Sequence, residues 1–387
     1  MKLLFLSKRR PQGKDLLTRP YGRFFHIPRA LAQKGHDVTL LLLSYRKEPC
    51  SRIEKEGLTW ISESFYPAGP FPYVARAKRL VEELEPDWVV GFSDTYFGIL
   101  AAMLGQKYGI LSVIDAYDNY ESYIPWLKPL HHLWRKALSK ATVVTAAGPD
   151  LAELLASFRT DKRATVVPMA PDPNFCPMDR QTCRQELGLP LGKKIVGYCG
   201  SIFRNRGVEV MFEAFEILRS RYADLHFVLT GRRERGLSVP AAFQHLGYLP
   251  DHLIPLFLNS LDVQVVVNRV SGFGSFSYPV KLYEGMICRI PVVATETGPT
   301  KWILGNREQF LAASEDALDV AAKTRALLSL GRADYGSVGS WERSSELFER
   351  VLQSSAEKSR PGKPKEILSW RSRHEDPARE RSHGELL

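Results

Sequence analysis

The chain has 387 residues, 44% of them hydrophobic and 25% charged, a composition that excludes a wholly disordered protein and leaves room for two domains. A net charge of +10 favours a polyanionic partner surface, namely nucleic acid, anionic lipid or a phosphate-bearing substrate. The chain has no zinc-finger spacing, no RNP-like strand pair and no basic recognition helix, so nucleic acid is not an expected partner.

The first half of the chain alternates apolar strands with helical stretches, which is the order of a doubly wound parallel sheet. Its first apolar run is too short for a signal peptide and no later run approaches the length of a membrane span, so we expect a cytoplasmic protein. The expected strands cover residues 2–6, 38–43, 88–91, 112–115, 142–146 and 166–167, and the expected helices cover 24–34, 75–84, 98–108 and 130–139.

The stretch from Tyr123 to Lys140 mixes tryptophan and leucine with lysine and arginine. This composition is typical of a segment that lies on an anionic lipid surface. It is equally typical of an amphipathic helix whose leucines enter the core. Both interpretations stay open, and the first predicts a peripheral position at the inner face of the cytoplasmic membrane.

Proline interrupts this alternation in PMAPDPNFCPMD, at residues 168–179. We expect a first α/β domain over residues 1–168, a hinge over 169–193 and a second α/β domain over 194–339. Residues 354–387 are rich in Lys, Arg, Glu, Ser and Pro, which predicts a disordered basic tail. In the second domain the expected strands cover 195–199, 226–230, 264–267 and 291–294, and the expected helices cover 208–219, 254–259, 281–287 and 318–330.

The segment SYPVKLYEGMICRIPVVATET, residues 277–297, predicts a helix, a turn and a buried strand. Pro279 is expected in the first turn, after a cap at Ser277 or Tyr278. Lys281 and Glu284 share one face of this helix. They form either an ordinary surface ion pair or part of a site, at the helix N-terminus, for a diphosphate and a ribose.

This segment resembles the donor site of retaining GT-B glycosyltransferases, in the large family (family four) that includes sucrose synthase. Other stretches are similar to the family in the same order: RALAQKGHDVTLLL at 29–42, IVGYCGSIFRNRGVEVMFEAF at 195–215 and SWERSSELFERVL at 340–352. The resemblance covers about residues 1–353. It implies the GT-B fold, in which a first, acceptor domain and a second, nucleotide-sugar donor domain, both doubly wound and Rossmann-like, face a central cleft. A C-terminal helix at about 340–353 is expected to cross back to the first domain.

The resemblance also implies a donor site. Arg206 and Lys281 stand at two lysines of the family's motifs, so both are expected to contact the diphosphate and to stabilise it as it leaves. Glu284 is expected to bind the ribose hydroxyls. The expected donor-binding residues are Gly200, Ser201, Arg204, Arg206, Gly274, Lys281 and Glu284.

Two positions depart from the family's motifs. Ser201 stands where an arginine is frequent, and Arg204 is the residue expected to compensate. Phe276 stands where the first glutamate of the E-x7-E motif belongs, which leaves the donor sugar open. The loop from Ser271 to Gly274 is similar to a displaced version of the family's E-G-F-G loop, and its amides are expected to face the sugar.

In the first domain, IDAYDN at residues 114–119 ends a strand and places Asp115 and Asp118 toward the cleft. Each is expected either to bind sugar hydroxyls and orient the acceptor, or to cap the next helix. With Arg206 and Lys281 they make up the expected catalytic residues. The candidates on the acceptor side lie in or after the first loop, and they are Gly13, Gly22, Arg23 and His26.

Neither a metal nor a cofactor is expected. The five cysteines are widely spread without a C-x-x-C pair, which predicts neither a zinc site nor a disulfide framework. Neither half has an Asp-x-Asp pair, so basic side chains and a helix N-terminus are expected to hold the diphosphate of the co-substrate.

These features, with the resemblance, predict a metal-independent glycosyltransferase, and the resemblance implies that it retains the anomeric configuration. It would move a hexose from a nucleotide diphosphate sugar to a hydroxyl of a saccharide or lipid-linked acceptor, in the synthesis of a cell-surface polysaccharide or glycan. A sugar-nucleotide 2-epimerase, which shares the fold, is one alternative. A non-catalytic nucleotide-sugar-binding assembly subunit is another, motivated by Ser201 and by the missing glutamate.

Overall fold

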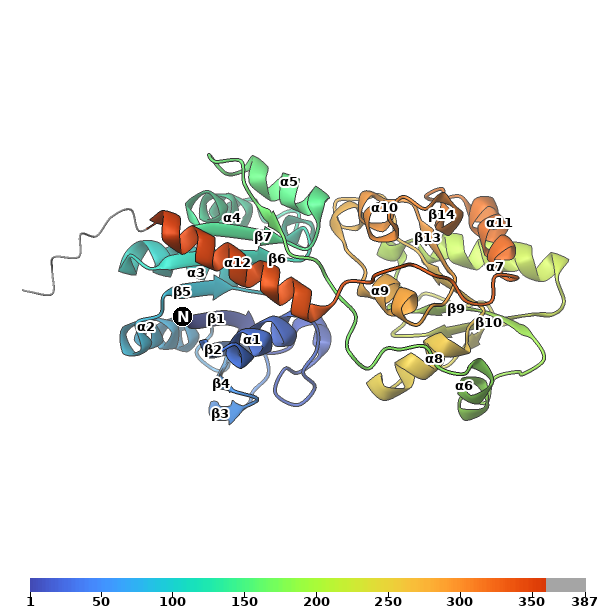
Figure 1. Cartoon of the computed structure of the whole chain (residues 1–387), viewed down its shortest axis with the longest axis horizontal. Helices are drawn as coiled ribbons and strands as arrows, with labels where there is room; N and C mark the ends of the chain where they lie inside the picture. Colours follow the sequence, from blue (N-terminus) through green and yellow to red (C-terminus); the bar gives the residue numbers. More distant parts are fainter. Residues whose placement is uncertain (360–387) are drawn as a thin grey trace, which may run out of the picture.

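The chain folds into two α/β domains that lie side by side (Figure 1). The computed structural model describes residues 1–359. Each domain has a sheet with helices packed on its two faces, so the two doubly wound domains expected from the sequence are confirmed.

The first domain contains an eight-stranded sheet in the order β3-β4-β2-β1-β5-β6-β7-β8. Neighbouring strands are parallel except for β3 and β4, which form an antiparallel pair at one edge. The sequence analysis did not predict either strand. Strand β3 is exposed along most of its length and shows no apolar period, whereas β4 has buried side chains and was missed all the same. The strands are β1 (Lys2–Lys8), β2 (Asp37–Ser44), β3 (Ser51–Lys55), β4 (Leu58–Ser64), β5 (Trp88–Gly91), β6 (Leu111–Ala116), β7 (Val143–Ala146) and β8 (Thr165–Val166).

The helices of the first domain were expected apart from α5, which is short and starts at a proline. Their apolar faces pack on the buried side chains of the sheet. These helices are α1 (Arg23–Gln33), α2 (Phe71–Leu84), α3 (Thr95–Tyr108), α4 (Lys128–Lys140) and α5 (Pro149–Ser157).

The second domain contains a six-stranded parallel sheet in the order β11-β10-β9-β12-β13-β14. Its central strands are buried, which explains their continuous apolar runs in the sequence. The strands are β9 (Lys194–Cys199), β10 (Leu225–Thr230), β11 (Gln244–His245), β12 (Val263–Val266), β13 (Val292–Thr295) and β14 (Leu311–Ala312). The helices are α6 (Arg180–Glu186), α7 (Val208–Arg221), α8 (Ile254–Ser260), α9 (Val280–Ile287), α10 (Gly298–Leu304) and α11 (Ala317–Leu327).

Part of the expected hinge, residues 169–193, is packed on the second domain. Its residues 180–186 form α6, which lies against α8. Arg184 of α6 makes a buried ion pair with Asp262, with 2.6 Å between Nη2 and Oδ2. The segment before α6 has no helix or strand, so the change of direction between the domains falls there.

The closing helix α12 (Trp341–Ser359) crosses back to the first domain and lies along it (Figure 1). The ring of Phe348 stacks on that of Phe5 at 6.4 Å, and Glu349 pairs with Lys34 and His36 at 2.7 and 2.8 Å. The helix runs beyond residue 353 because Ala356 still packs on the core, so the expected start of the tail at 354 is wrong. The rest of the predicted tail, 360–387, lies outside the described residues.

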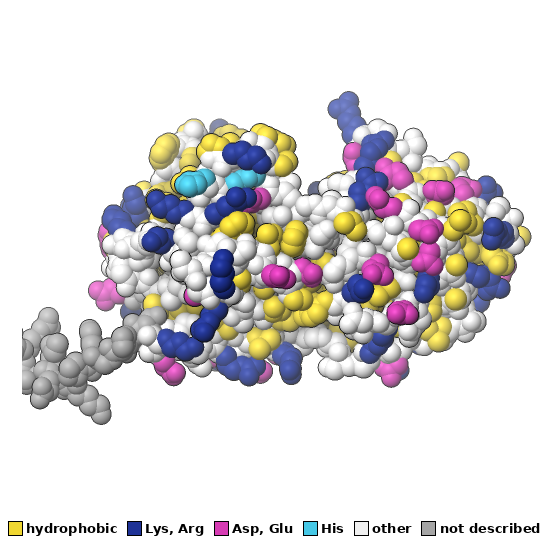
Figure 2. All heavy atoms as spheres, turned by 90° about the horizontal axis from the view of Figure 1, so that it is seen from above, with side chains coloured by type: hydrophobic (Ala, Val, Ile, Leu, Met, Phe, Trp, Pro, Cys, Tyr) yellow, Lys and Arg dark blue, Asp and Glu magenta, His cyan; other side chains and the backbone are white. Residues whose placement is uncertain are grey.

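Helix α4 packs one face on the core, which confirms the amphipathic interpretation, and the position on a membrane stays a prediction. His131, Trp134, Ala137 and Leu138 face the core, as in an ordinary amphipathic helix. Leu133 is 51% exposed, and Trp126, just before the helix, is 76% exposed. Figure 2 looks onto this side of the molecule, where hydrophobic side chains lie beside Lys, Arg and His. Within residues 1–359, no helix has both the length and the apolarity that crossing a bilayer requires.

Candidate functional site

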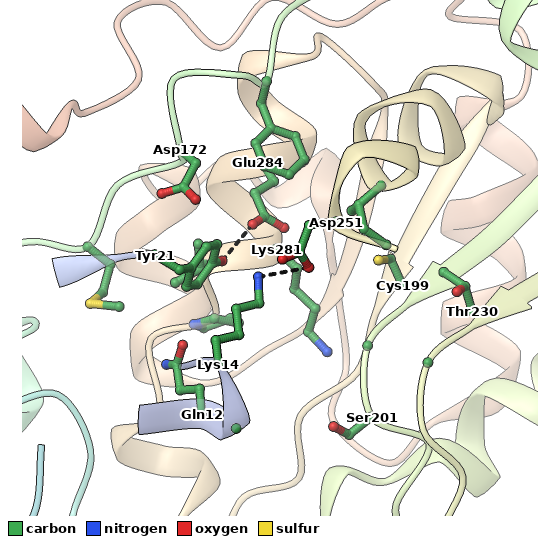
Figure 3. Close-up of a pocket in the computed structure, with 18 of the residues that line it drawn as sticks. Gln12, Lys14, Tyr21, Asp172, Cys199, Ser201, Thr230, Asp251, Lys281 and Glu284 are labelled. Atoms are coloured by element: carbon green, nitrogen blue, oxygen red, sulfur yellow. Dashed lines mark hydrogen bonds and ion pairs between the residues drawn. The ribbon is translucent and has the colours of Figure 1, made fainter. Parts of the chain in front are cut away.

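A cavity of about 820 Å³ lies between the two domains (Figure 3). The loop that follows β1 and the end of β6 supply its first-domain wall, and the loops after β9 and β10 and the start of α9 supply the second. Both sheets therefore present the carboxyl ends of strands to it, as expected for doubly wound domains. The ionisable side chains that line it are Lys14, His26, Asp118, Asp172, Arg206, Arg232, Asp251, Lys281 and Glu284.

The structure brings most of the expected residues together at this cavity. The expected residues that line it are Gly13, His26, Asp118, Gly200, Ser201, Arg206, Lys281 and Glu284. Five others are not part of the lining: Gly22, Arg23, Asp115, Arg204 and Gly274.

Helix α9 directs two of these side chains into the cavity. Leu282, Tyr283 and Met286 pack in the core, which leaves Lys281 and Glu284 on the cavity side. Pro279 is the residue before the helix and not part of its first turn, because its ψ of 112° is extended. The expected cap at Ser277 or Tyr278 is also wrong, because Pro279 itself holds the N-cap position and no side chain caps the helix. The Tyr278 hydroxyl instead donates 2.8 Å to Asp150 Oδ2 of the first domain.

Lys281 is a half-buried lysine at the cavity wall with few protein partners. Its Nζ donates to the Tyr198 hydroxyl at 3.2 Å and lies 4.6 Å from the centre of that ring. Tyr198 in turn donates to the Ser201 carbonyl at 2.8 Å. Burial lowers the pKa of Lys281 from 10.5 to about 7, and the positive charge of Arg206 acts in the same direction. A negatively charged ligand beside Lys281 would stabilise its ammonium form and so raise its pKa again.

Glu284 accepts a hydrogen bond from the first domain. The Tyr21 hydroxyl donates to Glu284 Oε1 at 2.9 Å (Figure 3). Burial raises the pKa of Glu284 to about 7, although the Tyr21 hydroxyl and the charges of Lys14 and Lys281 oppose the rise. The carboxylate expected to bind ribose is therefore covered by a tyrosine in this conformation.

The loop that carries Tyr21 is tied to the second domain by ion pairs. Lys14 lies 3.4 Å from the centre of the Tyr21 ring, and its Nζ is 3.2 Å from Asp251 Oδ1 (Figure 3). Arg19 Nη2 contacts Asp251 Oδ2 at 2.6 Å. These partners are exposed enough for water and salt to weaken them, so the loop can be displaced at modest cost.

Arg206 comes from a short 3₁₀ turn, residues 204–206, ahead of α7. Its guanidinium lies 4.4 Å from the centre of the Phe273 ring, and Nη1 is 3.4 Å from Ser277 Oγ. Arg204 in the same turn points elsewhere, to Glu234 at 3.3 Å on the surface, so the prediction that it replaces the missing arginine is wrong.

Asp118 contributes a first-domain carboxylate to the cavity. Its Oδ2 accepts a 2.6 Å hydrogen bond from the Tyr123 hydroxyl. Burial raises its pKa to about 6, and the Tyr123 hydrogen bond and the charge of Arg206 limit the rise. Asp118 is thus placed opposite the cations of the second domain.

Asp115 and Arg23 form a structural ion pair, which corrects their expected roles in catalysis and on the acceptor side. Both side chains are fully buried, with Arg23 Nη2 and Nε donating to Asp115 at 2.6 and 2.9 Å. Thr145 Oγ1 donates to the same carboxylate at 2.6 Å, and Arg23 Nη1 donates to the Val167 carbonyl at 3.2 Å. The pair therefore ties α1 to the carboxyl ends of β6 and β7, away from the cavity.

Gly22 and Gly274, the other two expected residues outside the lining, allow backbone conformations that a side chain would hinder. Gly22 precedes α1 with a φ of +63°, which favours glycine, and its N–H lies 3.4 Å from Asp172 Oδ1. The same carboxylate oxygen is 2.8 Å from His26 Nε2, so His26 reaches the cavity as a partner of the interdomain segment. Gly274 lies where a Cβ would clash with the Arg269 carbonyl oxygen, so the conformation of its loop requires glycine.

Several cavity residues were not found by the sequence analysis. Arg232 lies two residues after the carboxyl end of β10, so the strand-end argument alone could have identified it. Lys14 and Tyr21 lie in an irregular loop, and Asp251 reaches them from the other domain. No local periodicity indicates such contacts. Within residues 1–359, no three His, Cys, Asp or Glu side chains are grouped closely enough to hold a metal ion.

Two family descriptions match the chain, one in each domain. Residues 23–170 match the glycosyl transferase 4-like domain, and residues 193–330 match the glycosyl transferases group 1 domain. With two doubly wound domains around an interdomain cavity, the chain belongs to the group 1 glycosyltransferases of the GT-B fold and is a transferase enzyme.

Individual proteins agree with this assignment. The chain is 23% identical over 278 residues to a putative teichuronic acid biosynthesis glycosyltransferase, TuaC, of Bacillus subtilis, covering 70% of this chain and 67% of that one. Sucrose-phosphate synthase of Thermosynechococcus elongatus superimposes with a TM-score of 0.73 at 16% identity, covering 92% of this chain and 98% of that one. Anabaena HepE, solved in complex with UDP-glucose, superimposes with a TM-score of 0.69 at 15% identity, covering 92% and 100%.

Proposed function

We propose that this enzyme transfers a hexose from a nucleotide diphosphate sugar to a hydroxyl of a saccharide or lipid-linked acceptor, without a metal ion. The observation that carries the proposal is the meeting of Lys281, Arg206 and Glu284 in one interdomain cavity. Two cations and the N–H groups at the start of α9 suit a diphosphate, and a carboxylate at the next turn suits the two hydroxyls of a ribose.

The chemistry asked of these residues is electrostatic. The bond between the anomeric carbon and the diphosphate oxygen breaks, and a glycosidic bond forms to the acceptor oxygen. The departing phosphate oxygen takes the proton of the acceptor hydroxyl. Lys281 and Arg206 stabilise the negative charge that develops on the diphosphate, and the half-buried position of Lys281 strengthens its effect.

Asp118 is the first-domain group that we assign to the transferred hexose. Its carboxylate faces the cavity and keeps an ionised form at neutral pH, because its pKa is about 6. We propose that it binds sugar hydroxyls and orients the acceptor. Retention of configuration is proposed on the resemblance to family four, in which the P-x-K-x-x-E segment carries Lys281 and Glu284.

The acceptor is proposed to belong to a cell-surface polysaccharide or glycan, on the likeness to the teichuronic acid enzyme of Bacillus subtilis. A peripheral position on the cytoplasmic membrane fits the exposed Trp126 and Leu133 beside Lys128 and Lys136. Vesicle pelleting tests this proposal. We expect more binding to anionic than to neutral vesicles, and less of it in Trp126→Ser/Leu133→Ser. Equal binding to both vesicle types would contradict it.

The donor proposal is tested by release of UDP from UDP-glucose, the ligand of the HepE complex, in the presence of EDTA. We expect release that rises with a saccharide acceptor, is lost in Lys281→Met and persists in the surface control Leu318→Ala, whose side chain is 63% exposed in α11. Conversion to a 2-epimer without an acceptor would instead indicate an epimerase. Calorimetry with UDP, GDP and ADP shows the preferred base, and failure of all three to bind would refute the site.

A further inference from the structure

A second surface lies beside the cavity, at the carboxyl ends of four neighbouring strands of the first domain. The strands β4, β2, β1 and β5 are adjacent and parallel, so Tyr45, Lys8 and Asp94 emerge at one edge of the sheet. Phe65 joins them because its N–H donates to the Ser44 carbonyl at 2.8 Å. Strand β1 begins at the N-terminus and runs toward the second domain, so this edge faces it (Figure 1).

This edge carries exposed aromatic rings. Tyr45, Tyr66 and Tyr96 are 46%, 54% and 46% exposed. The Tyr45 ring lies 5.5 Å from Phe65, which lies 5.6 Å from Tyr66. We call these four residues the aromatic patch. Neighbouring aromatic rings left in water mark a binding surface, and the tyrosine hydroxyls suit a ligand that is itself rich in hydroxyls.

A charged pair borders the aromatic patch. Lys8 Nζ is 3.5 Å from Asp94 Oδ2, and both side chains are about one-fifth exposed. Asp94 also caps α3, because its Oδ1 accepts 2.7 Å from the Thr95 N–H. Its second oxygen and the Lys8 ammonium remain accessible to a ligand.

The backbone that places Asp94 is strained. Ser93 is not glycine, yet it has a φ of +71°. Its Oγ accepts hydrogen bonds from Ser7 Oγ at 2.9 Å and from the Lys8 N–H at 3.1 Å, which hold this conformation. A costly backbone conformation that turns a carboxylate toward the edge of the sheet is typical of a binding site.

The aromatic patch is electrostatically continuous with the cavity. The Lys8 ammonium lies close enough to Asp118 to lower its pKa, against the larger effect of burial. On the other side, the pKa of Tyr45 is raised by partial desolvation and by the neighbouring Asp94 and Tyr96. In the sheet, β6, whose end precedes Asp118, is the neighbour of β5, whose end precedes Asp94. The order along this edge is therefore Asp118, then Asp94 with Lys8, then the aromatic patch.

We propose that the aromatic patch, with Lys8 and Asp94, binds a sugar ring of the acceptor that follows the ring being glycosylated. The proposal rests on the proposed function and adds the class of acceptor, an oligosaccharide of at least two rings. The reacting ring lies at Asp118, and the next ring stacks on Tyr45 and Tyr66, with its hydroxyls bonded to Asp94 and Lys8.

Saturation-transfer NMR of the full chain tests this subsite, with cellobiose, maltose, lactose and diacetylchitobiose as probes and UDP present. We expect at least one disaccharide to bind the native protein. Removal of two stacking rings in Tyr45→Ala/Tyr66→Ala should weaken that binding roughly fivefold or more. The surface control Leu318→Ala should leave it unchanged, and UDP affinity should be the same in all three proteins.

Two results would overturn the subsite while leaving the donor site intact. One is binding of UDP without binding of any disaccharide, and the other is equal disaccharide binding in the double variant. Binding of neutral phosphatidylcholine vesicles that disappears in Tyr45→Ala/Tyr66→Ala would also overturn it, by assigning the aromatic patch to lipid. Absence of UDP binding to the native protein would instead refute the proposed function.

Discussion

Replacement of Lys281 by methionine should change the stability of the empty protein and its affinity for nucleotide in opposite directions. Methionine keeps an unbranched apolar chain beside the Tyr198 ring and removes the charge. In the empty protein burial lowers the pKa of Lys281 from 10.5 to about 7. Carrying the charge at pH 6 then costs roughly 5 kcal/mol. The net effect is smaller than this cost, because the ammonium faces a cavity that admits water and because the substitution removes a hydrogen bond to Tyr198. We therefore expect Lys281→Met to raise the free energy of unfolding at pH 6 by about 2 kcal/mol.

The direction of the pH effect follows from the lowered pKa. The charged form is the costly one, so the destabilisation is fully present below about pH 7 and fades as the pH rises toward 10.5. Lys281→Met should therefore be more stable than the native protein at pH 6, with little difference near pH 10. Nucleotide binding should weaken by about 1.5 to 3 kcal/mol, roughly 10- to 150-fold, since a charge-assisted hydrogen bond to phosphate is lost.

Urea unfolding at pH 6 and pH 10, with and without UDP, measures both effects on one sample. Leu318→Ala serves as the control, because its exposed side chain lies in α11, outside the cavity lining. The reasoning would be refuted by a Lys281→Met protein that is less stable than native at pH 6 and is still stabilised by UDP to the native extent.

Three further variants test separate parts of the structure. Asp118→Asn should remove the part of the fall in transfer rate that lies below about pH 6, where the Asp118 carboxylate is protonated, and should leave the part near pH 7 that belongs to Glu284; an unchanged pH profile argues against its role. Tyr21→Phe frees Glu284 for ribose and should tighten UDP binding about three- to tenfold in calorimetry, whereas weaker binding would mean that the hydroxyl assists the nucleotide. Arg23→Met leaves Asp115 as a buried unpaired charge and should lower the unfolding free energy in urea by about 3–5 kcal/mol, with recovery in Arg23→Met/Asp115→Leu; native stability of the single variant is the contrary result.

The fold could be predicted because most of its strands are buried on both faces and its helices have one apolar side. A strand such as β5 (Trp88–Gly91) is found at the expected residues because it is a short run of buried side chains. The edge strand β3 (Ser51–Lys55) was missed because its side chains face water. Residues 354–359 were assigned to the tail for a similar reason, since composition does not show that α12 continues along the first domain.

The candidate site could be predicted where the spacing of residues along a helix decides which way their side chains point. Lys281 and Glu284 are three residues apart on α9, so burial of Leu282 and Met286 leaves both at the cavity. Asp115 shows the limit of this approach. A carboxylate at a strand end faces either the cleft or the core, and Arg23, far away in sequence, decides for the core.

Contacts between the domains could not be predicted from the sequence, for another reason. The hydrogen bond of Tyr21 to Glu284 and the ion pair of Lys14 with Asp251 depend on the path of an irregular loop and on the placement of two domains. No local pattern in the sequence indicates the path of this loop or the placement of the domains. The cover over Glu284 is therefore visible only in three dimensions.

A crystal structure of the chain with UDP bound, grown in EDTA, would show whether the donor lies at the start of α9. We predict that the diphosphate lies on Lys281 and Arg206, that the ribose hydroxyls contact Glu284, and that Tyr21 has moved away from that carboxylate. A nucleotide bound elsewhere, with the Tyr21 hydroxyl still on Glu284, would contradict the account.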